Sequence, residues 1–265
     1  GKINEIINGA TDWVYEEEFS IHKGFEWSPD SKKLAYYVFD ETDVKEFQMK
    51  MYGTLYPTHY KFKYPKAGED NSLISIRIYD TQYDRHFIFD IGNNPDIYIP
   101  RIMWSKRKDE LIVFKMNRLQ NKLELLSGTF SMDTPNNIGI KTKPIYTEEC
   151  STYIDIHDNT SFINENEFIW TSEKDGYNHI YLINYANGSE KQLTNGDWDV
   201  TEVYGYASRS KKIFFQAAKS HPTKREVYAL HTKNNKIELL TEKSGTNEAN
   251  FSKTFNYFIN THSSA

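Results

Sequence analysis

Short apolar runs separated by polar turns follow one another along the whole chain, and one arrangement of them is repeated. In residues 25–37, an apolar run ending at Trp27 is followed by a turn containing Pro29 and by a second apolar run. Pro at the first corner of a turn favours a strand, turn and strand arrangement. Related segments begin at Met103, Phe162, Ala207 and Phe251. The last three starts are about 45 residues apart, a period typical of four-stranded β-propeller blades.

This repeat predicts an all-β chain made of propeller blades, each with four antiparallel strands. Within one unit, Asp175-Gly176 and Asn187-Gly188 separate strand-like runs, and both pairs favour tight hairpin turns. We expect a partial propeller over residues 1–265. Its parts are an edge strand over residues 2–7 and an acidic helical segment within 1–23, blades at 24–92, 97–148, 150–195 and 198–242, and a partial blade at 246–262.

Residues 41–71 interrupt the first predicted blade and form an insertion. The segment is rich in aromatic residues, namely Tyr52, Tyr56, Tyr60, Phe62 and Tyr64. A long loop in a compact domain is usually functional or disordered, and this one is too aromatic for a disordered linker. We interpret it as an arm that packs on a partner surface. The alternative is that it folds back on its own blade.

The most unusual segment precedes the first repeat and carries three consecutive glutamates. It reads Asp12-Trp13-Val14-Tyr15-Glu16-Glu17-Glu18. Two carboxylates about 4 Å apart repel by roughly 1 kcal/mol in water and about four times that near a protein surface. Thr11 or Asp12 can cap a short helical turn, whose positive N-terminus tolerates carboxylates, while Trp13 and Tyr15 anchor it to a core. The segment is therefore a candidate cation-binding site, with a solvated acidic turn as the alternative.

Composition narrows the possible functions. At 265 residues, with 38% hydrophobic and 15% aromatic residues, the chain can bury a sizeable core. A net charge of -5 and scattered basic residues argue against nucleic-acid binding. No apolar run has the length of a membrane span or a secretory signal. The one cysteine, Cys150, excludes an internal disulfide, and we expect it to be a small core residue.

Familiar catalytic motifs are missing from the chain. The spacing of the 13 glycines excludes G-x-S-x-G, dinucleotide-binding and P-loop motifs. The histidines show no metal-binding spacing, so we expect no metal and no cofactor. Glu17 and Glu18 are poor candidates for paired-carboxylate hydrolysis, because adjacent residues rarely face one bond from opposite sides. We predict no catalytic residue within this chain.

Four motifs, taken in order, resemble the propeller of dipeptidyl peptidase IV enzymes in the prolyl oligopeptidase family. They are DWVYEEE from Asp12, WSPDSKKLAYYVFD from Trp27, YPKAG from Tyr64 and SEKDGYNHIYL from Ser172. The resemblance extends over essentially the whole chain. It implies an eight-bladed propeller, of which this chain is a part, that caps an α/β-hydrolase domain of the same polypeptide.

The resemblance also implies a function. Glu17 and Glu18 match the two family glutamates that hold the free amino terminus of a peptide substrate. The parent is then expected to be a serine exopeptidase that releases Xaa-Pro or Xaa-Ala dipeptides, to dimerise through the 41–71 arm and to act in the periplasm or at the cell surface.

Some functional residues of the family have no match within the chain. The family's catalytic triad would lie beyond Ala265 and a substrate-orienting arginine before Gly1, so we expect this chain alone to be inactive. A second family arginine has no counterpart near residues 153–158. The alternative is a non-enzymatic interaction propeller, since fold does not determine function. A G-x-S-x-G segment beyond Ala265 would decide between them.

Overall fold

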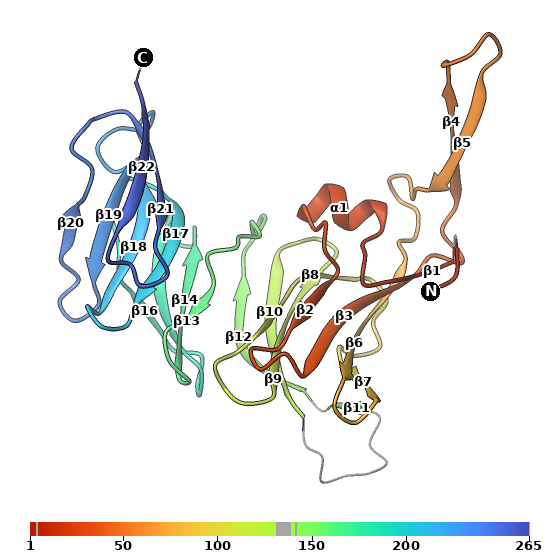
Figure 1. The fold of residues 1–265 in the computed structure, drawn as a ribbon, viewed down its shortest axis with the longest axis horizontal. Coiled ribbons are helices and arrows are strands. Elements are labelled where there is room, and N and C mark those ends of the chain that lie inside the picture. The colour runs from red at the N-terminus through yellow and green to blue at the C-terminus, as the bar shows by residue number, and fades with distance from the viewer. Residues whose placement is uncertain (4, 131–138, 141, 265) are drawn as a thin grey trace. The chain divides into compact units, whose positions relative to one another are not determined.

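The computed structural model describes residues 1–3, 5–130, 139–140 and 142–264, which fold into two compact units. The first unit is Gly1–Ile156 and the second is His157–Ala265. The elements of the first unit are β1 (Ile6–Asn8), α1 (Trp13–Phe19), β2 (Phe25–Trp27), β3 (Lys33–Asp40), β4 (Glu46–Met51), β5 (Thr58–Lys63), β6 (Leu73–Asp80), β7 (Arg85–Phe89), β8 (Ile97–Trp104), β9 (Glu110–Asn117), β10 (Lys122–Thr129), β11 (Gly139–Ile140) and β12 (Thr142–Glu149) (Figure 1).

The first sheet is built around β3, which pairs with β6 along one edge and with both β1 and β2 along the other. β1 lies opposite the end of β3 and β2 lies opposite its beginning. Between them, the Gly9 N–H donates to the Tyr37 carbonyl and the Tyr37 N–H donates to the Gly24 carbonyl, both at 2.9 Å. β1 and β2 are thus two halves of one edge strand, and residues 10–23, including α1, form an excursion from it.

Two glycines allow this excursion to close on itself. The Gly24 N–H donates to the Gly9 carbonyl at 3.2 Å, and Gly9 has a φ of 70°, in the left-handed region. A Cβ at Gly24 would lie 2.7 Å from the carbonyl oxygen of Ala10. The Thr11 hydroxyl also donates to the Ile21 carbonyl at 2.9 Å across the base of the excursion. The loop that carries α1 therefore has a fixed base on the sheet.

The insertion forms a hairpin, β4 paired with β5, that projects from the end of β3 in orange in Figure 1. Its base packs on the excursion, because the ring of Tyr64 lies 4.1 Å from that of Trp13. Its far end is exposed, including Tyr52, Leu55 and Tyr56. The base thus folds back on the first unit, while the far end leaves aromatic surface open.

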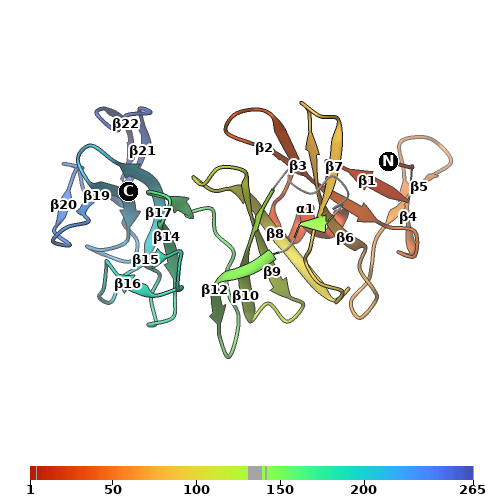
Figure 2. The same cartoon turned by 90° about the horizontal axis from the view of Figure 1, so that it is seen from below.

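The second sheet of this unit has the order β12, β10, β9 and β8, and all three pairings are antiparallel (Figure 2). Its buried positions are largely aliphatic, as a strand packed on both faces requires. The turn between β9 and β10 spans residues 118–121.

The second unit contains two four-stranded antiparallel sheets and a hairpin. Its elements are β13 (Ser161–Phe162), β14 (Glu167–Ser172), β15 (His179–Asn184), β16 (Glu190–Gln192), β17 (Val200–Ala207), β18 (Lys212–Ala217), β19 (Glu226–His231), β20 (Ile237–Leu239), β21 (Thr246–Phe251) and β22 (Phe258–Ser263). Each four-stranded sheet runs in sequence order, β13 to β16 and β17 to β20.

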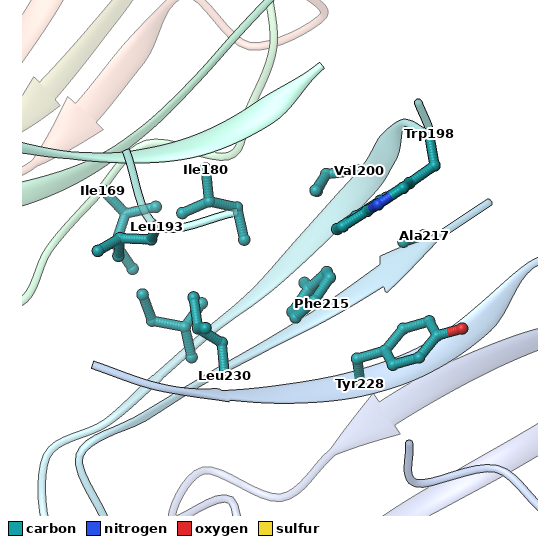
Figure 3. Packing of buried hydrophobic residues seen from close by; sticks show 10 residues of the cluster. Ile169, Ile180, Leu193, Trp198, Val200, Phe215, Ala217, Tyr228 and Leu230 are labelled. Atoms are coloured by element: carbon teal, nitrogen blue, oxygen red, sulfur yellow. The ribbon is translucent and has the colours of Figure 1, made fainter. Parts of the chain in front are cut away.

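A hydrophobic cluster joins these two sheets. It comprises Ile169, Ile180, Leu193, Trp198, Val200, Ile213, Phe215, Ala217, Tyr228 and Leu230 (Figure 3). The side chains come from alternate positions of the strands, as expected where sheets pack face to face. The β21–β22 hairpin packs on the second sheet through Phe251, whose ring lies 4.9 Å from that of Phe214.

The prediction of four-stranded antiparallel sheets is confirmed for the sheet of β8, β9, β10 and β12 and for the sheets β13–β16 and β17–β20, including the turns at Gly176 and Gly188, which both have positive φ. The first sheet differs, because its edge strand is divided into β1 and β2 and β11 pairs in parallel with β7. Two other predictions were wrong. The edge strand predicted to begin at Lys2 begins only at Ile6, where β1 starts, and Lys2 instead forms an isolated antiparallel bridge with Ile6. Cys150 is exposed rather than buried, since it follows the end of β12 where the chain leaves the sheet.

A buried polar group organises the cluster of the second unit. His179, which is fully buried, lies with Nε2 2.9 Å from the Gly196 carbonyl and Nδ1 3.1 Å from the Thr194 hydroxyl. Because a carbonyl only accepts, Nε2 carries the proton and Nδ1 accepts from Thr194. The Thr194 oxygen in turn accepts from the Ile180 N–H at 2.9 Å.

We predict that Thr194→Val lowers the free energy of unfolding by about 2 to 4 kcal/mol, because it leaves two buried polar groups without a partner. Urea unfolding followed by tryptophan fluorescence would measure the change. Thr261→Val, at an exposed strand position, is the matched control and should change stability little. An equal effect of the two substitutions would contradict the role given to Thr194.

Candidate functional site

The acidic segment forms α1, and its start is held by a buried cap. Asp12 has an extended backbone, and its Oδ1 accepts from the Tyr15 N–H at 2.9 Å. The other carboxylate oxygen accepts from the Ser72 hydroxyl. Asp12 is only 6% exposed, and burial raises the pKa of its carboxyl, partly opposed by these hydrogen bonds. Asp12 is thus the cap, whereas Thr11 bonds across the base of the excursion.

Tyr15 anchors the helix to the unit. Its side chain is 2% exposed, and its hydroxyl accepts from the Ile99 N–H of β8 at 2.9 Å. Its ring contacts those of Phe39 at 4.8 Å and Phe19 at 5.3 Å. Both buried residues of α1, Tyr15 and Phe19, are four positions apart and therefore share one face. The helix begins and ends on buried contacts.

Glu16, Glu17 and Glu18 occupy the opposite face, and all three are exposed. Glu16 lies in the first turn, where the helix N-terminus tolerates it, and pairs with His22 at 3.9 Å. Glu17 and Glu18 lie in the last turn, which has no basic residue. The positive helix N-terminus that was expected to tolerate these carboxylates therefore lies at the other end of the helix, and at the C-terminus Arg101 Nη1 donates to the Phe19 carbonyl at 2.9 Å. Within the described residues, neither Glu17 nor Glu18 has an ion-pair partner.

The surroundings of Glu18 are polar. Its Oε1 accepts from Gln120 Nε2, in the turn between β9 and β10, at 2.6 Å. The pKa of Tyr153 is raised mainly by burial, and the charges of Glu18 and Asp155 raise it further. This tyrosine is half exposed, and its hydroxyl is close enough to Glu18 for the two charges to interact. The structure thus places Gln120 and Tyr153 near Glu18, and the sequence had assigned neither of them a role.

A second acidic pair lies beneath the helix, at the root of the arm. Glu41 is 7% exposed, and burial together with the charge of Asp12 raises the pKa of its carboxyl to about 7, opposed by Lys63. Lys63 Nζ donates to the carbonyl of Val44 at 2.7 Å and so closes the root of the hairpin. The cap of the helix and the root of the arm are therefore coupled electrostatically through the buried carboxyls of Asp12 and Glu41.

Beside this root, a groove lies between the helix and the arm. Its lining is Trp13, Phe47, Met49, Phe62, Tyr64, Lys66 and Ala67. Lys66 Nζ lies 5.6 Å from the centre of the Phe47 ring. The lining of the groove is thus largely aromatic.

The residues around Glu17 and Glu18 suit an organic cation better than a metal ion. Across the described residues, no three His, Cys, Asp or Glu side chains converge to hold a metal ion. The exposed carboxylates of Glu17 and Glu18 and the ring of Tyr153 are instead suitable ligands for an ammonium group, which donates three hydrogen bonds. In the part of the chain that the structure describes, no helix is long and apolar enough to cross a membrane.

The fold and this site define a class of protein, a β-propeller region that displays two carboxylates from a helical excursion of a blade. The family described as "Dipeptidyl peptidase IV (DPP IV) N-terminal region" matches residues 1–265. The chain belongs to this family.

Individual relatives agree with the assignment. The chain is 39% identical to the crystallised dipeptidyl peptidase 4 of Porphyromonas gingivalis, with a TM-score of 0.89 over 99% of this chain and 37% of that one. It is 29% identical to prolyl endopeptidase FAP of Bos taurus over 87% of this chain and 32% of the relative. It is 27% identical to dipeptidyl peptidase 4 of Arthroderma otae over 85% of this chain and 30% of the relative. The chain spans about a third of the length of these proteins.

The raised pKa of Glu41 has a consequence for stability. A carboxyl with a usual pKa near 4.5 and a folded-state pKa of about 7 binds its proton more tightly when folded, so the contribution of Glu41 to stability is greatest below about pH 4.5 and is lost as the pH rises to about 7. Asp12, whose pKa is also raised, acts in the same direction.

We predict that Glu41→Gln, which mimics the protonated side chain, makes the protein more stable than wild type above pH 7, by at most about 3 kcal/mol. The difference should shrink at pH 5. Thermal unfolding at the two pH values measures it, with Glu46→Gln at an exposed position of the arm as the control. A constant difference between Glu41→Gln and wild type across this range would contradict the prediction.

Proposed function

We propose that this chain is the propeller region of a serine dipeptidyl peptidase and that Glu17 and Glu18 bind the free amino terminus of its peptide substrates. One observation carries the proposal. A member of this family displays two exposed carboxylates, without an ion-pair partner among the described residues, in the last turn of an anchored helix. Their electrostatic repulsion is relieved when an ammonium group binds.

The anchoring of the helix gives this site its role in specificity. Because Asp12 and Tyr15 fix α1 to the blade, a bound amino terminus is held at a fixed distance from the rest of the protein. A nucleophilic serine in a hydrolase domain of the same polypeptide then meets the bond after the second residue. The site would measure a dipeptide from its end, with Pro or Ala at the second position, and the propeller would limit access to it.

Two further proposals follow from the family and the arm. The exposed far end of the hairpin, with Tyr52, Leu55 and Tyr56, has the aromatic composition of an interface, and we assign it to a homodimer. The natural substrates would be extracytoplasmic peptides, so we place the parent enzyme in the periplasm or at the cell surface.

We predict that Glu17→Gln and Glu18→Gln in the full-length enzyme each lower kcat/KM for dipeptidyl chromogenic substrates by about tenfold or more, because each removes a charge-assisted hydrogen bond to the ammonium group. Glu16→Gln, which replaces the glutamate paired with His22, is the control and should have a smaller effect. Steady-state kinetics would measure all three. Equal cleavage of free and N-acetylated substrates by wild type would refute the proposed function.

We also predict that replacing residues 49–60 by an Asn-Gly turn leaves the sheets folded but converts the parent enzyme from dimer to monomer. The base of the arm, including Tyr64 and its contact with Trp13, is retained in this variant. Small-angle scattering reports the mass, and circular dichroism reports the sheets. Tyr52→Ser combined with Tyr56→Ser tests the same surface without shortening the hairpin. A dimer that survives both changes would assign the arm another role.

A further inference from the structure

Gln120 makes an unusual contact with the proposed substrate site. Its Nε2 donates to Glu18 Oε1 at 2.6 Å, although the two residues are 102 positions apart. This is the one hydrogen bond that its side chain makes within the described residues, since its Oε1 is buried without a partner. Rotating the amide by 180° would place oxygen against the carboxylate oxygen, so Glu18 fixes its orientation.

The backbone at Gln120 is strained. Its φ is 55°, in the left-handed region that favours Gly or Asn. The turn itself is closed by main-chain bonds, from the Gln120 N–H to the Asn117 carbonyl and from the Ile154 N–H to the Gln120 carbonyl. Gly would satisfy the same bonds with less strain. The glutamine side chain therefore contributes nothing that the turn requires.

Adjacent glutamates on a helix need such a partner. Successive side chains leave a helix about 100° apart, so the carboxylates of Glu17 and Glu18 diverge unless one is held. Both are exposed, and long exposed side chains lose rotamer entropy when they are fixed. A donor that fixes Glu18 in advance removes part of this cost from substrate binding.

We propose that Gln120 is a positioning residue that holds the Glu18 carboxylate in the orientation needed to bind the substrate's amino terminus. This rests on the proposed function of Glu17 and Glu18. The amide donates to one oxygen and leaves the remaining lone pairs of Glu18 for the ammonium group. Because the amide is uncharged, it orients the carboxylate without neutralising its charge. A lysine in its place would neutralise it.

The test uses the full-length enzyme and a glycyl-prolyl chromogenic substrate. Gln120→Gly should raise KM about tenfold and change kcat by no more than about twofold, because binding is weakened and the chemistry is not. The thermal midpoint should stay at or above that of wild type, since strain is relieved. Lys211→Gly, at another residue with left-handed φ (57°) in a hairpin turn, is the matched control and should leave KM unchanged.

Gln120→Glu gives a second readout that a structural role would not move. It places two carboxylates at hydrogen-bond distance, so they share a proton and their apparent pKa rises. The acidic side of the pH profile of kcat/KM (its acid limb) should then shift to higher pH by about one unit or more. Other titratable or charged groups near Glu18 include Glu16, Glu17, His22, Arg101, Tyr153 and Asp155, which are the same in both proteins.

The outcomes separate the two proposals. If wild type cleaves N-acetylated and free substrates equally, the proposed function fails and the role of Gln120 fails with it. If wild type requires a free amino terminus but Gln120→Gly keeps a normal KM and Gln120→Glu a normal acid limb, only the positioning role is overturned. If Gln120→Gly has a lower thermal midpoint than Lys211→Gly, the pH dependence of kcat/KM for Gln120→Glu decides whether Gln120 positions Glu18. An unshifted acidic side of that profile would then overturn the positioning role.

Discussion

The site depends on the pair of main-chain hydrogen bonds by which Tyr37 holds both Gly9 and Gly24. They allow an edge strand to be interrupted without leaving buried donors and acceptors unpaired, which a sheet does not tolerate. The excursion then carries a helix whose position is set by the sheet rather than by a flexible loop. A helix of seven residues would not be stable alone, so its order comes from Asp12, Tyr15 and these two junctions.

Two pairs of acidic residues near this helix have opposite environments. Asp12 and Glu41 are buried, where desolvation favours the protonated carboxyl, and they join the helix to the root of the arm. Glu17 and Glu18 are exposed to solvent in the last turn of the helix. Burial therefore separates a structural acidic pair from an exposed one, although both pairs lie on or beside the same helix.

Local signals predicted the sheets and the helix. The 45-residue period, the Asp-Gly and Asn-Gly turns and the capping Asp12 are all properties of neighbouring residues, and the structure has the expected elements. The edge strand at residues 2–7 and the burial of Cys150 were predicted wrongly, because pairing partners and sheet ends decide them. Gln120 and Glu41 carried no signal, since their roles come from tertiary contacts with α1.

The chemistry of the exposed pair favours an ammonium group over other cations. Ca²⁺ and Mg²⁺ take six or more oxygen ligands in a compact shell, and two divergent carboxylates from one helix turn supply few of them. An ammonium group needs three acceptors spread over a wider angle, which matches side chains that leave the helix about 100° apart. With Glu18 held by Gln120, only Glu17 must adjust to the ligand. The divergence that disfavours a metal is thus compatible with the binding of a terminal amine that we propose.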